Sequence, residues 1–274
     1  MCRWIAYSGA PLFLEDLLFQ PEHSLIDQSL EARRTSSTTN GDGFGIGWYG
    51  HRESPGVYKD VQPAWNDPNL RDLAAQVRAG VFLAHVRAST GTAVQRTNCH
   101  PFRHARWLFV HNGLVSEFPR LRRELLFAVD PGLFPEVEGT TDSELLFFLA
   151  LTFGLEDDAV GAMERMVGFV EEVARSHGVE APLQMTAGLS DGERLMGVRY
   201  SSVADTRTLY VSKSVEAIRA INPTLADRLP VDARAIVSEP LSDLDEYWLE
   251  IPEATAVLIS GGDVESRPFA PTSA

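Results

Sequence analysis

Hydrophobic and polar residues alternate in short runs through the first half of the chain. Each run is bounded by Gly, Pro or Asn, which is typical of β-strands separated by turns rather than of long helices. The pattern predicts strands over residues 3–7, 44–49, 57–60, 81–86 and 107–110. The first half should therefore be built mainly from strands.

The middle of the chain changes to helical spacing. Residues 141–144 read Thr-Asp-Ser-Glu, the form of a capping box, and an apolar run follows them, so we expect a buried helix that stops near Gly154. A second helix is predicted from Asp157 or Asp158 to Ser176, because acids stand at its start and apolar residues recur at helical spacing.

The β pattern returns in the last third of the chain. Strands are predicted over residues 184–190, 195–200, 209–212, 235–238 and 256–259. The dipeptide Asp191-Gly192 predicts a hairpin turn between the first two. Strands, two helices and strands again favour an α+β fold of two sheets with helices packed outside them. We expect one domain over residues 1–267 and a flexible tail over 268–274.

Composition narrows the classes of function. The 274 residues include 24 Lys and Arg against 38 Asp and Glu, a net charge of −14, so attraction to nucleic acid or anionic lipid is not expected. No apolar run approaches the ~20 residues of a membrane helix, and no signal peptide is recognisable. Two cysteines cannot form a disulfide framework, which favours a cytoplasmic protein.

Cys2 stands directly behind Met1. Removal of the methionine would leave one residue with both a thiol and a free α-amine, which is a nucleophile and its base together. The amine titrates near pH ~8 and can accept a proton at neutral pH. The alternative is that Cys2 is a small apolar residue at the start of a buried strand.

Residues 84–91 end an apolar strand with a guanidinium and two hydroxyl groups. Arg87 can hold a carboxylate through two parallel hydrogen bonds, which would position an amino-acid substrate. His85 and Thr90 stand in the same segment, and we include both in the predicted substrate site. A surface salt bridge is the alternative role for Arg87.

Two further places offer polar groups to a substrate. Asn112 and Gly113 follow an apolar strand and provide an amide side chain beside a backbone N–H, although Asn-Gly taken alone favours a tight turn. Asp142 stands at the start of the predicted helix, where its carboxylate can bind a substrate ammonium or can simply stabilise the helix N-terminus.

The ordered set of these motifs resembles a known family. A cysteine near the N-terminus, Ala-His-x-Arg, His-Asn-Gly and Gly-Thr-Thr-Asp-Ser-Glu occur in the order found in the class II glutamine amidotransferase domain of the N-terminal nucleophile hydrolases. The resemblance covers roughly residues 2–260. It implies a four-layer αββα sandwich of two mainly antiparallel sheets, and release of ammonia from glutamine through a γ-glutamyl thioester.

The resemblance also implies a role for each residue. Cys2 would be the nucleophile with its α-amine as base, and Asn112 with the Gly113 N–H would form the oxyanion hole. Arg87 would bind the α-carboxylate and Asp142 the α-ammonium. Ala88 replaces an aromatic residue of the synthetase-fused members, which leaves the identity of the γ-glutamyl substrate open.

Residues 21–29 and 40–49 resemble the stand-alone branch of the family, which includes the γ-glutamyl hydrolase of ergothioneine biosynthesis. The glycines of 40–49 lack the spacing of a nucleotide-binding loop. The partner expected is a small γ-glutamyl substrate. Either a separate synthetase accepts the ammonia or the reaction ends in hydrolysis. A non-catalytic γ-glutamyl or amino-acid sensor on the same fold is the alternative function.

No cofactor and no metal are expected. Cys99 and His100 are adjacent, but neighbours on an extended chain point to opposite faces and do not form a nucleophile pair. His100 and His104 have the spacing of a zinc pair on a helix, yet Pro101 disfavours a helix there and no further ligands complete a site.

Overall fold

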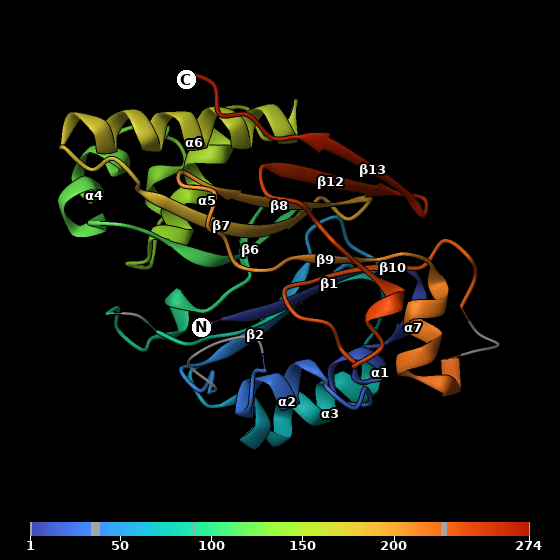
Figure 1. The fold of residues 1–274 in the computed structure, drawn as a ribbon. Helices are drawn as coiled ribbons and strands as arrows, with labels where there is room; N and C mark the ends of the chain where they lie inside the picture. The colour runs from blue at the N-terminus through green and yellow to red at the C-terminus, as the bar shows by residue number, and fades with distance from the viewer. Residues whose placement is uncertain (1, 34–38, 90, 226–228, 274) are drawn as a thin grey trace.

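The computed structural model describes residues 2–33, 39–89, 91–225 and 229–273. Two sheets stack face to face, and helices cover the outer face of each (Figure 1). The helices α4, α5 and α6 lie on one side, and α1, α2, α3 and α7 lie on the other. The predicted α+β class and the four-layer αββα arrangement are confirmed.

Sheet A has seven strands in the described part of the chain, in the order β11-β9-β10-β1-β4-β2-β3, and its neighbours pair antiparallel. Its strands are β1 (Arg3–Phe13), β2 (Phe44–Trp48), β3 (Gly56–Asp60), β4 (Arg78–Val86), β9 (Tyr210–Ser212), β10 (Arg234–Val237) and β11 (Trp248–Glu250). The first and last thirds of the chain therefore meet in one sheet, with β1 beside both β4 and β10.

Sheet B has six strands among the described residues, in the order β13-β12-β8-β7-β6-β5, again antiparallel. Its strands are β5 (Phe102–His104), β6 (Trp107–Val115), β7 (Leu183–Ser190), β8 (Arg194–Ser201), β12 (Thr255–Ser260) and β13 (Asp263–Pro268). The β7–β8 connection is the predicted hairpin, in which the Asp191 carboxylate accepts from the N–H groups of Glu193 and Arg194.

The helices differ in length between the two sides. The α-helices are α1 (Glu15–Leu18), α2 (Leu25–Leu30), α3 (Pro68–Gln76), α4 (Phe118–Phe127), α5 (Asp142–Thr152), α6 (Ala159–Ser176) and α7 (Val215–Ile221). Short 3-10 turns are η1 (Ala64–Asn66), η2 (Arg96–Asn98), η3 (Phe134–Glu136), η4 (Pro223–Leu225) and η5 (Asp245–Tyr247). None of the described helices is both long enough and apolar enough to span a bilayer.

Alternation along the strands divides the core into three layers. Trp4 and Ala6 of β1 face the space between the sheets, while Ile5 and Tyr7 face the helices outside sheet A. In β6, Leu108 points between the sheets and Phe109 points toward α5 and α6. The middles of these two strands are thus apolar on both faces, because both faces are covered.

The two predicted helices are confirmed, with one correction at the first. Thr141 accepts from the backbone N–H of Glu144, as a capping box requires. The Glu144 carboxylate does not return to Thr141 but accepts from the N–H groups of Glu138 and Gly139. The loop before α5 therefore competes for this side chain, so that only half of the capping box forms.

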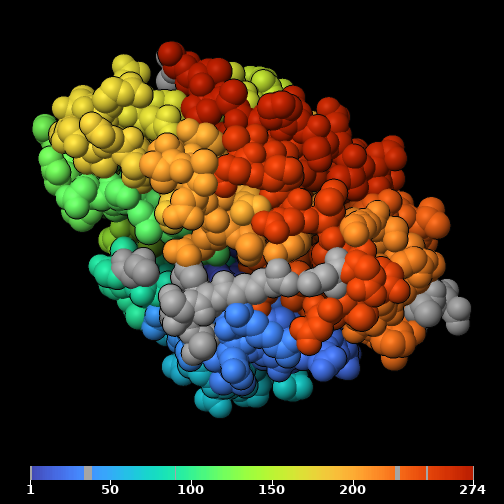
Figure 2. Space-filling view, in the orientation of Figure 1, coloured from blue at the N-terminus to red at the C-terminus, as the bar shows by residue number. Residues whose placement is uncertain are grey.

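Residues 268–273, over which a flexible tail is predicted, make contacts with the rest of the fold. Phe269 is buried, and its N–H donates to the Ala254 carbonyl. The N–H of Thr272 donates to the Glu164 carbonyl on α6, where Gly168 leaves room for this close approach. Figure 2 shows this segment, in red, lying against the yellow-green helix layer.

Candidate active site

Three strands bring polar side chains to one end of the layer between the sheets. The register that pairs Arg3 with Val86 puts Cys2 opposite Arg87, on the same face as Trp4 and Leu83. Asn112 follows Leu108 and Val110 on the inward face of β6. We call this region the polar end; it comprises Cys2, His85, Arg87, Asn112, Gly113 and Asp142.

Cys2 is half-buried at the start of β1. The N–H and the carbonyl of Ala88 each lie 3.5 Å from its sulfur. Burial raises the pKa of the Cys2 thiol, against the opposing effects of the Ala88 N–H and of the Arg87 and Arg3 charges. The thiol is therefore protonated at neutral pH and needs a base when it reacts.

Arg87 is buried and its guanidinium is held on several sides. It donates to the carbonyl of Asp42 at 3.3 Å and to the hydroxyl of Thr92 at 2.6 Å. The Asp42 carboxylate in turn accepts from the N–H of Ser89 at 2.7 Å. These contacts fix the guanidinium beside Cys2, which favours a role in holding an anion there.

His85 lies two residue pairs further into β4 than Arg87, opposite Trp4, and is almost completely buried. Its Nε2 is 3.3 Å from the His111 carbonyl on the facing sheet, and its ring stacks on His100 at 4.1 Å. Burial, followed by the Arg87 charge, lowers the pKa of His85 to about 3, so that the ring is neutral. The geometry suits a contact between the sheets better than direct contact with a substrate.

Asn112 and Gly113 lie within β6, not in a turn, because the strand continues to Val115. The tight turn that Asn-Gly alone favours is therefore wrong. Within the described residues the Asn112 side-chain amide has no hydrogen-bond partner. It is an amide donor on the face of β6 that is directed toward sheet A.

The strand pairing also leaves the backbone N–H of Gly113 without an acceptor among the described residues. Ser116 donates to Pro182 on the β7 side, whereas Val115 donates away from β7 to Asp142. Because successive residues of a strand donate to opposite sides, Gly113 donates on the same side as Val115. Strand β5 occupies that side only as far as its pairing with Phe109. A Cβ on Gly113 would lie 1.9 Å from the Gln184 carbonyl, so no other residue fits.

Asp142 is the first residue of α5 and is anchored on the same edge of β6. One carboxylate oxygen accepts from the Val115 N–H at 2.8 Å and the other from the Ser143 N–H at 2.7 Å. The open N–H of Gly113 lies two residues along this edge. The second of these oxygens also accepts from the Ser143 hydroxyl at 3.2 Å, whereas the oxygen bonded to Val115 keeps a lone pair for a further donor, such as an ammonium.

Thr90, which we predicted as part of the substrate site, lies outside the described residues. His100 and His104 do not share a helix, because η2 ends before His100 and β5 begins at Phe102. His104 pairs instead with Glu136 at 2.8 Å. The described ranges contain no group of three or more His, Cys, Asp or Glu placed to hold a metal.

The sequence analysis missed a charged network behind Cys2. Arg3 donates to the Cys2 carbonyl at 2.9 Å and forms an ion pair with Glu239 at 2.7 Å. Glu239 also accepts from His23 at 2.6 Å. Both Arg3 and Glu239 are almost completely buried, so the network fixes the start of β1. The only sequence signal for this network was residues 21–29, which contain His23. The family resemblance includes this run, but the sequence alone gave it no physical role.

The glycines of residues 40–49 have a packing role. A Cβ on Gly43, whose φ is +109°, would lie 2.6 Å from the Cys99 sulfur. A Cβ on Gly45 would lie 2.2 Å from the His100 carbonyl, and one on Gly47 would contact Leu108. The run allows the chain at Cys99 and His100, and Leu108 of sheet B, to approach β2 closely.

Comparison with known sequences gives matches over nearly the whole chain. The family described as class-II glutamine amidotransferases matches residues 20–273. The chain is 39% identical to the probable glutamine amidotransferase DUG3 of Saccharomyces cerevisiae, over 98% of this chain and 84% of that protein. It is 28% identical to the γ-glutamyl-hercynylcysteine sulfoxide hydrolase of Mycolicibacterium smegmatis, over 98% and 100%.

Solved structures agree with these matches. A glutamine aminotransferase class-II domain protein from Silicibacter pomeroyi superimposes with a TM-score of 0.74 at 35% identity, covering 98% of this chain and all of that one. The glutamine phosphoribosylpyrophosphate amidotransferase of B. subtilis superimposes with a TM-score of 0.67 at 15% identity, covering half of that chain. The second likeness supports the fold alone.

Proposed function

The chain belongs to the class-II glutamine amidotransferases, and from this membership we propose that it cleaves a γ-glutamyl amide through a thioester on Cys2. The products are glutamate and ammonia or an amine. One observation carries the proposal. The Asn112 amide and the Gly113 N–H, which have no partner in the described part of the chain, lie at the same end of the inter-sheet layer as the thiol and a fixed guanidinium.

The reaction begins with proton transfer. Once Met1 is removed, the α-amine of Cys2 takes the thiol proton while the sulfur attacks the side-chain carbonyl carbon. The raised pKa of the Cys2 thiol makes this base necessary, because little thiolate is present beforehand. The carbonyl oxygen becomes an oxyanion that accepts hydrogen bonds from Asn112 and Gly113.

Collapse of the tetrahedral intermediate breaks the carbon–nitrogen bond. The leaving nitrogen takes the proton from the α-ammonium of Cys2, and the γ-glutamyl group remains on sulfur as a thioester. Water then attacks the thioester and gives its proton to the same amine. Glutamate leaves and the thiol is restored.

The substrate is held by charge at its α-carbon. Arg87 binds the α-carboxylate and Asp142 binds the α-ammonium, with Thr90 contributing to the same site. His85 does not touch the substrate in this proposal and acts as a positioning residue. As a neutral ring bonded to the His111 carbonyl, it positions β6 and its oxyanion donors against β4.

The leaving group decides between two forms of the reaction. Similarity to a γ-glutamyl hydrolase over almost the full chain favours an amide other than glutamine. A synthetase that accepts ammonia would instead make glutamine the substrate, and its co-purification would identify this form. We place the enzyme in the cytoplasm, where a reducing environment keeps Cys2 a free thiol. The sensor alternative requires that Met1 is retained.

The matched pair of variants Cys2→Ser and Cys99→Ser tests the proposal. Cys2→Ser should reduce release of glutamate from glutamine and from γ-glutamyl amides to the background rate, because the weaker nucleophile lacks a strong base. Cys99→Ser should keep its turnover, since Cys99 lies buried behind Gly43. Normal turnover by Cys2→Ser would refute the thioester mechanism.

A further inference from the structure

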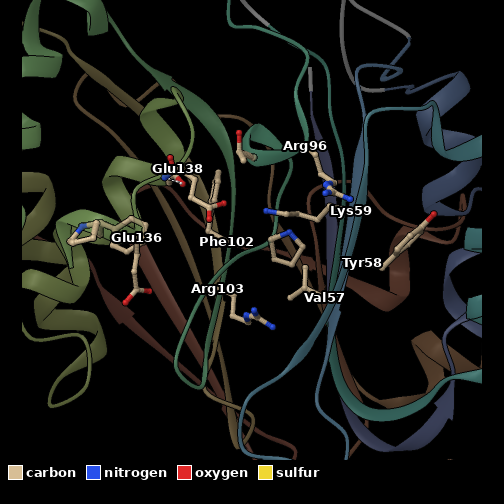
Figure 3. A pocket seen from close by; sticks show the side chains of 13 residues that line it. Val57, Tyr58, Lys59, Arg96, Phe102, Arg103, Glu136 and Glu138 are labelled. Carbon is tan, nitrogen blue, oxygen red and sulfur yellow. Dashed lines mark hydrogen bonds between the residues drawn. The ribbon is translucent and has the colours of Figure 1, made fainter. Parts of the chain in front are cut away.

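A cleft of about 490 Å³ between the edges of β3 and β5 carries both signs of charge. Its charged residues, shown in Figure 3, include Lys59, Arg96, Arg103, Glu136 and Glu138. The cleft therefore does not select for ions of one sign. Arg207 lies in a different environment, on the segment that joins β8 to β9, toward the other edge of sheet A.

The sheet register places Arg207 level with Cys2. Val237 of β10 pairs with Ile5 of β1 on one side and with Tyr210 of β9 on the other. Strands β1 and β9 therefore run in the same direction, and counting back three residues along each leads to Cys2 and to Arg207. The backbone at Arg207 thus lies two strand spacings, ~10 Å, from the start of β1.

Arg207 also lies on the inward face of sheet A. Leu209, directly before β9, belongs to the apolar cluster between the sheets, as Trp4 of β1 does. Because residues two apart in an extended segment share a face, Arg207 and Cys2 both point into the layer between the sheets. The guanidinium lies within electrostatic range of Cys2, and of His111 on the facing sheet.

The backbone on both sides of Arg207 is anchored, whereas its side chain is not. Thr206 donates to the Glu253 carboxylate. Thr208 donates to the Ser238 carbonyl at 2.9 Å. The Nε of Arg207 is buried and has no hydrogen-bond partner in the described part of the chain. A buried donor without an acceptor is destabilising, so a ligand that supplies the acceptor gains affinity there.

The carboxylates near Arg207 leave its charge available to a ligand. Glu239 is bonded to Arg3 and to His23. Asp205 is exposed, and within the ranges that the structure describes it forms no ion pair with Arg207. Burial, followed by the charge of Arg3, lowers the pKa of Arg207, yet a guanidinium stays protonated at neutral pH.

Cys2 lies between two guanidinium groups. Sheet A has the order β9-β10-β1-β4, so Arg87 at the end of β4 lies on one side of Cys2 and Arg207 lies on the other. In the proposed function, Arg87 holds the α-carboxylate of the glutamyl part, which occupies the β4 side. The amine that leaves therefore extends toward β10 and β9, where Arg207 stands.

We propose that Arg207 determines specificity by binding a carboxylate on the leaving amine. This role rests on the proposed function and deepens it, because it makes the preferred substrate a γ-glutamyl amide of an amino acid or peptide. The ammonia that leaves from glutamine offers the guanidinium no partner. A carboxylate accepts two parallel hydrogen bonds from it. Arg87 and Arg207 thereby hold the two ends of the substrate, with the scissile bond between them at Cys2.

Two substrates that differ in one group test this role. γ-Glutamylalanine carries the carboxylate, and γ-glutamylalaninamide replaces it by a neutral carboxamide. In Arg207→Gln, kcat/KM for γ-glutamylalanine should fall about 10- to 100-fold more than kcat/KM for γ-glutamylalaninamide, the equivalent of a lost charged hydrogen bond. Comparing the variant with the parent on both substrates cancels the difference in basicity between the two leaving amines.

Two further variants keep the result specific. Arg207→Lys retains the charge and should keep part of the preference for the carboxylate, whereas Arg52→Gln removes an exposed charge between β2 and β3 and should change neither rate. Thermal melting of each variant checks that it is folded.

The outcomes separate this role from the proposed function. An equal fall for both substrates in Arg207→Gln, or the same loss of preference in Arg52→Gln, would overturn the role of Arg207 and leave the proposed function standing. A parent protein that turns over neither glutamine nor either amide would contradict the proposed function, and the role of Arg207 with it.

Discussion

The layer between the two sheets has two halves that are built from the same strands but do different things. In the packed half, Trp4, Leu83 and Leu108 interlock and are completely or almost completely buried. In the polar end, Cys2, Arg87 and Asn112 continue the same inward-facing rows. The first half is held by apolar contact and the second by hydrogen bonds and charge.

The apolar core and the candidate site are separated by only two residues along each strand. Asn112 stands two residues beyond Val110 on β6, and Cys2 stands two residues before Trp4 on β1. Because residues two apart in a strand share a face, the side chains of the polar end point in the same direction as those of the packed half. Packing of the apolar residues therefore fixes the orientation of the polar ones. Changes in the packed half should therefore affect stability, and changes in the polar end should affect turnover.

Asn112→Ala should have the largest effect on turnover with the smallest effect on stability. Loss of one oxyanion donor lowers the rate ~10²- to 10³-fold, while the fold is unaffected because the side chain has no partner among the described residues. Steady-state kinetics with a γ-glutamyl amide and a urea titration measure the two quantities. Asn69→Ala, exposed on α3, is the control. Unchanged turnover in Asn112→Ala would remove this residue from the site.

The opposite result is expected from Leu108→Ala in the packed half. Leu108 is fully buried and lies against Gly47, so truncation should leave a cavity and lower the free energy of unfolding by about 2–5 kcal/mol. The rate per folded molecule should stay within a few-fold of the parent. A large loss of rate in the folded variant would contradict the division between the halves.

Stability at low pH should depend on the charged network behind Cys2. The bonds from His23 and Arg3 outweigh burial and lower the pKa of Glu239 to about 2, below its ordinary 4.5. Because the folded pKa is depressed, the stabilisation is present above pH 4.5 and is lost as the pH falls toward 2. The pKa difference corresponds to about 3 kcal/mol.

Urea titrations at pH 7 and pH 3 measure this dependence. The loss between the two pH values should be smaller in Glu239→Gln than in the parent, by up to about 2 kcal/mol, because pH 3 is still above the folded pKa of Glu239. Asp243→Asn is the control, because that carboxylate is exposed and should change the loss little. An identical loss in Glu239→Gln and the parent would show that the network does not stabilise the fold.

The architecture of the strongly patterned regions was predictable from the sequence. The helices α5 and α6 and most long strands were found within a few residues, because their burial on one or both faces fixes the periodicity. The short helices α1, α2, α3, α4 and α7 were not predicted. Several are one or two turns long, and tertiary packing against sheet A or sheet B decides their form.

The candidate site was predictable in part. Cys2, Arg87, Asn112 and Asp142 were chosen from their chemistry and their order in the chain, and the fold brings them to one region. The network of Arg3, His23 and Glu239 was not predictable, since it joins residues more than two hundred positions apart. The role of Asn112 beside Gly113 also depended on the early end of β5, which no local pattern indicates.

The central claim is that Cys2, with its own α-amine free, is the nucleophile. Intact-mass spectrometry and peptide mapping test it directly on protein treated with a diazo-ketone analogue of glutamine. The account predicts a chain that lacks Met1 and carries one adduct on Cys2, while Cys99 stays unmodified. An adduct on Cys99 alone, or full turnover by a chain that retains Met1, would contradict it.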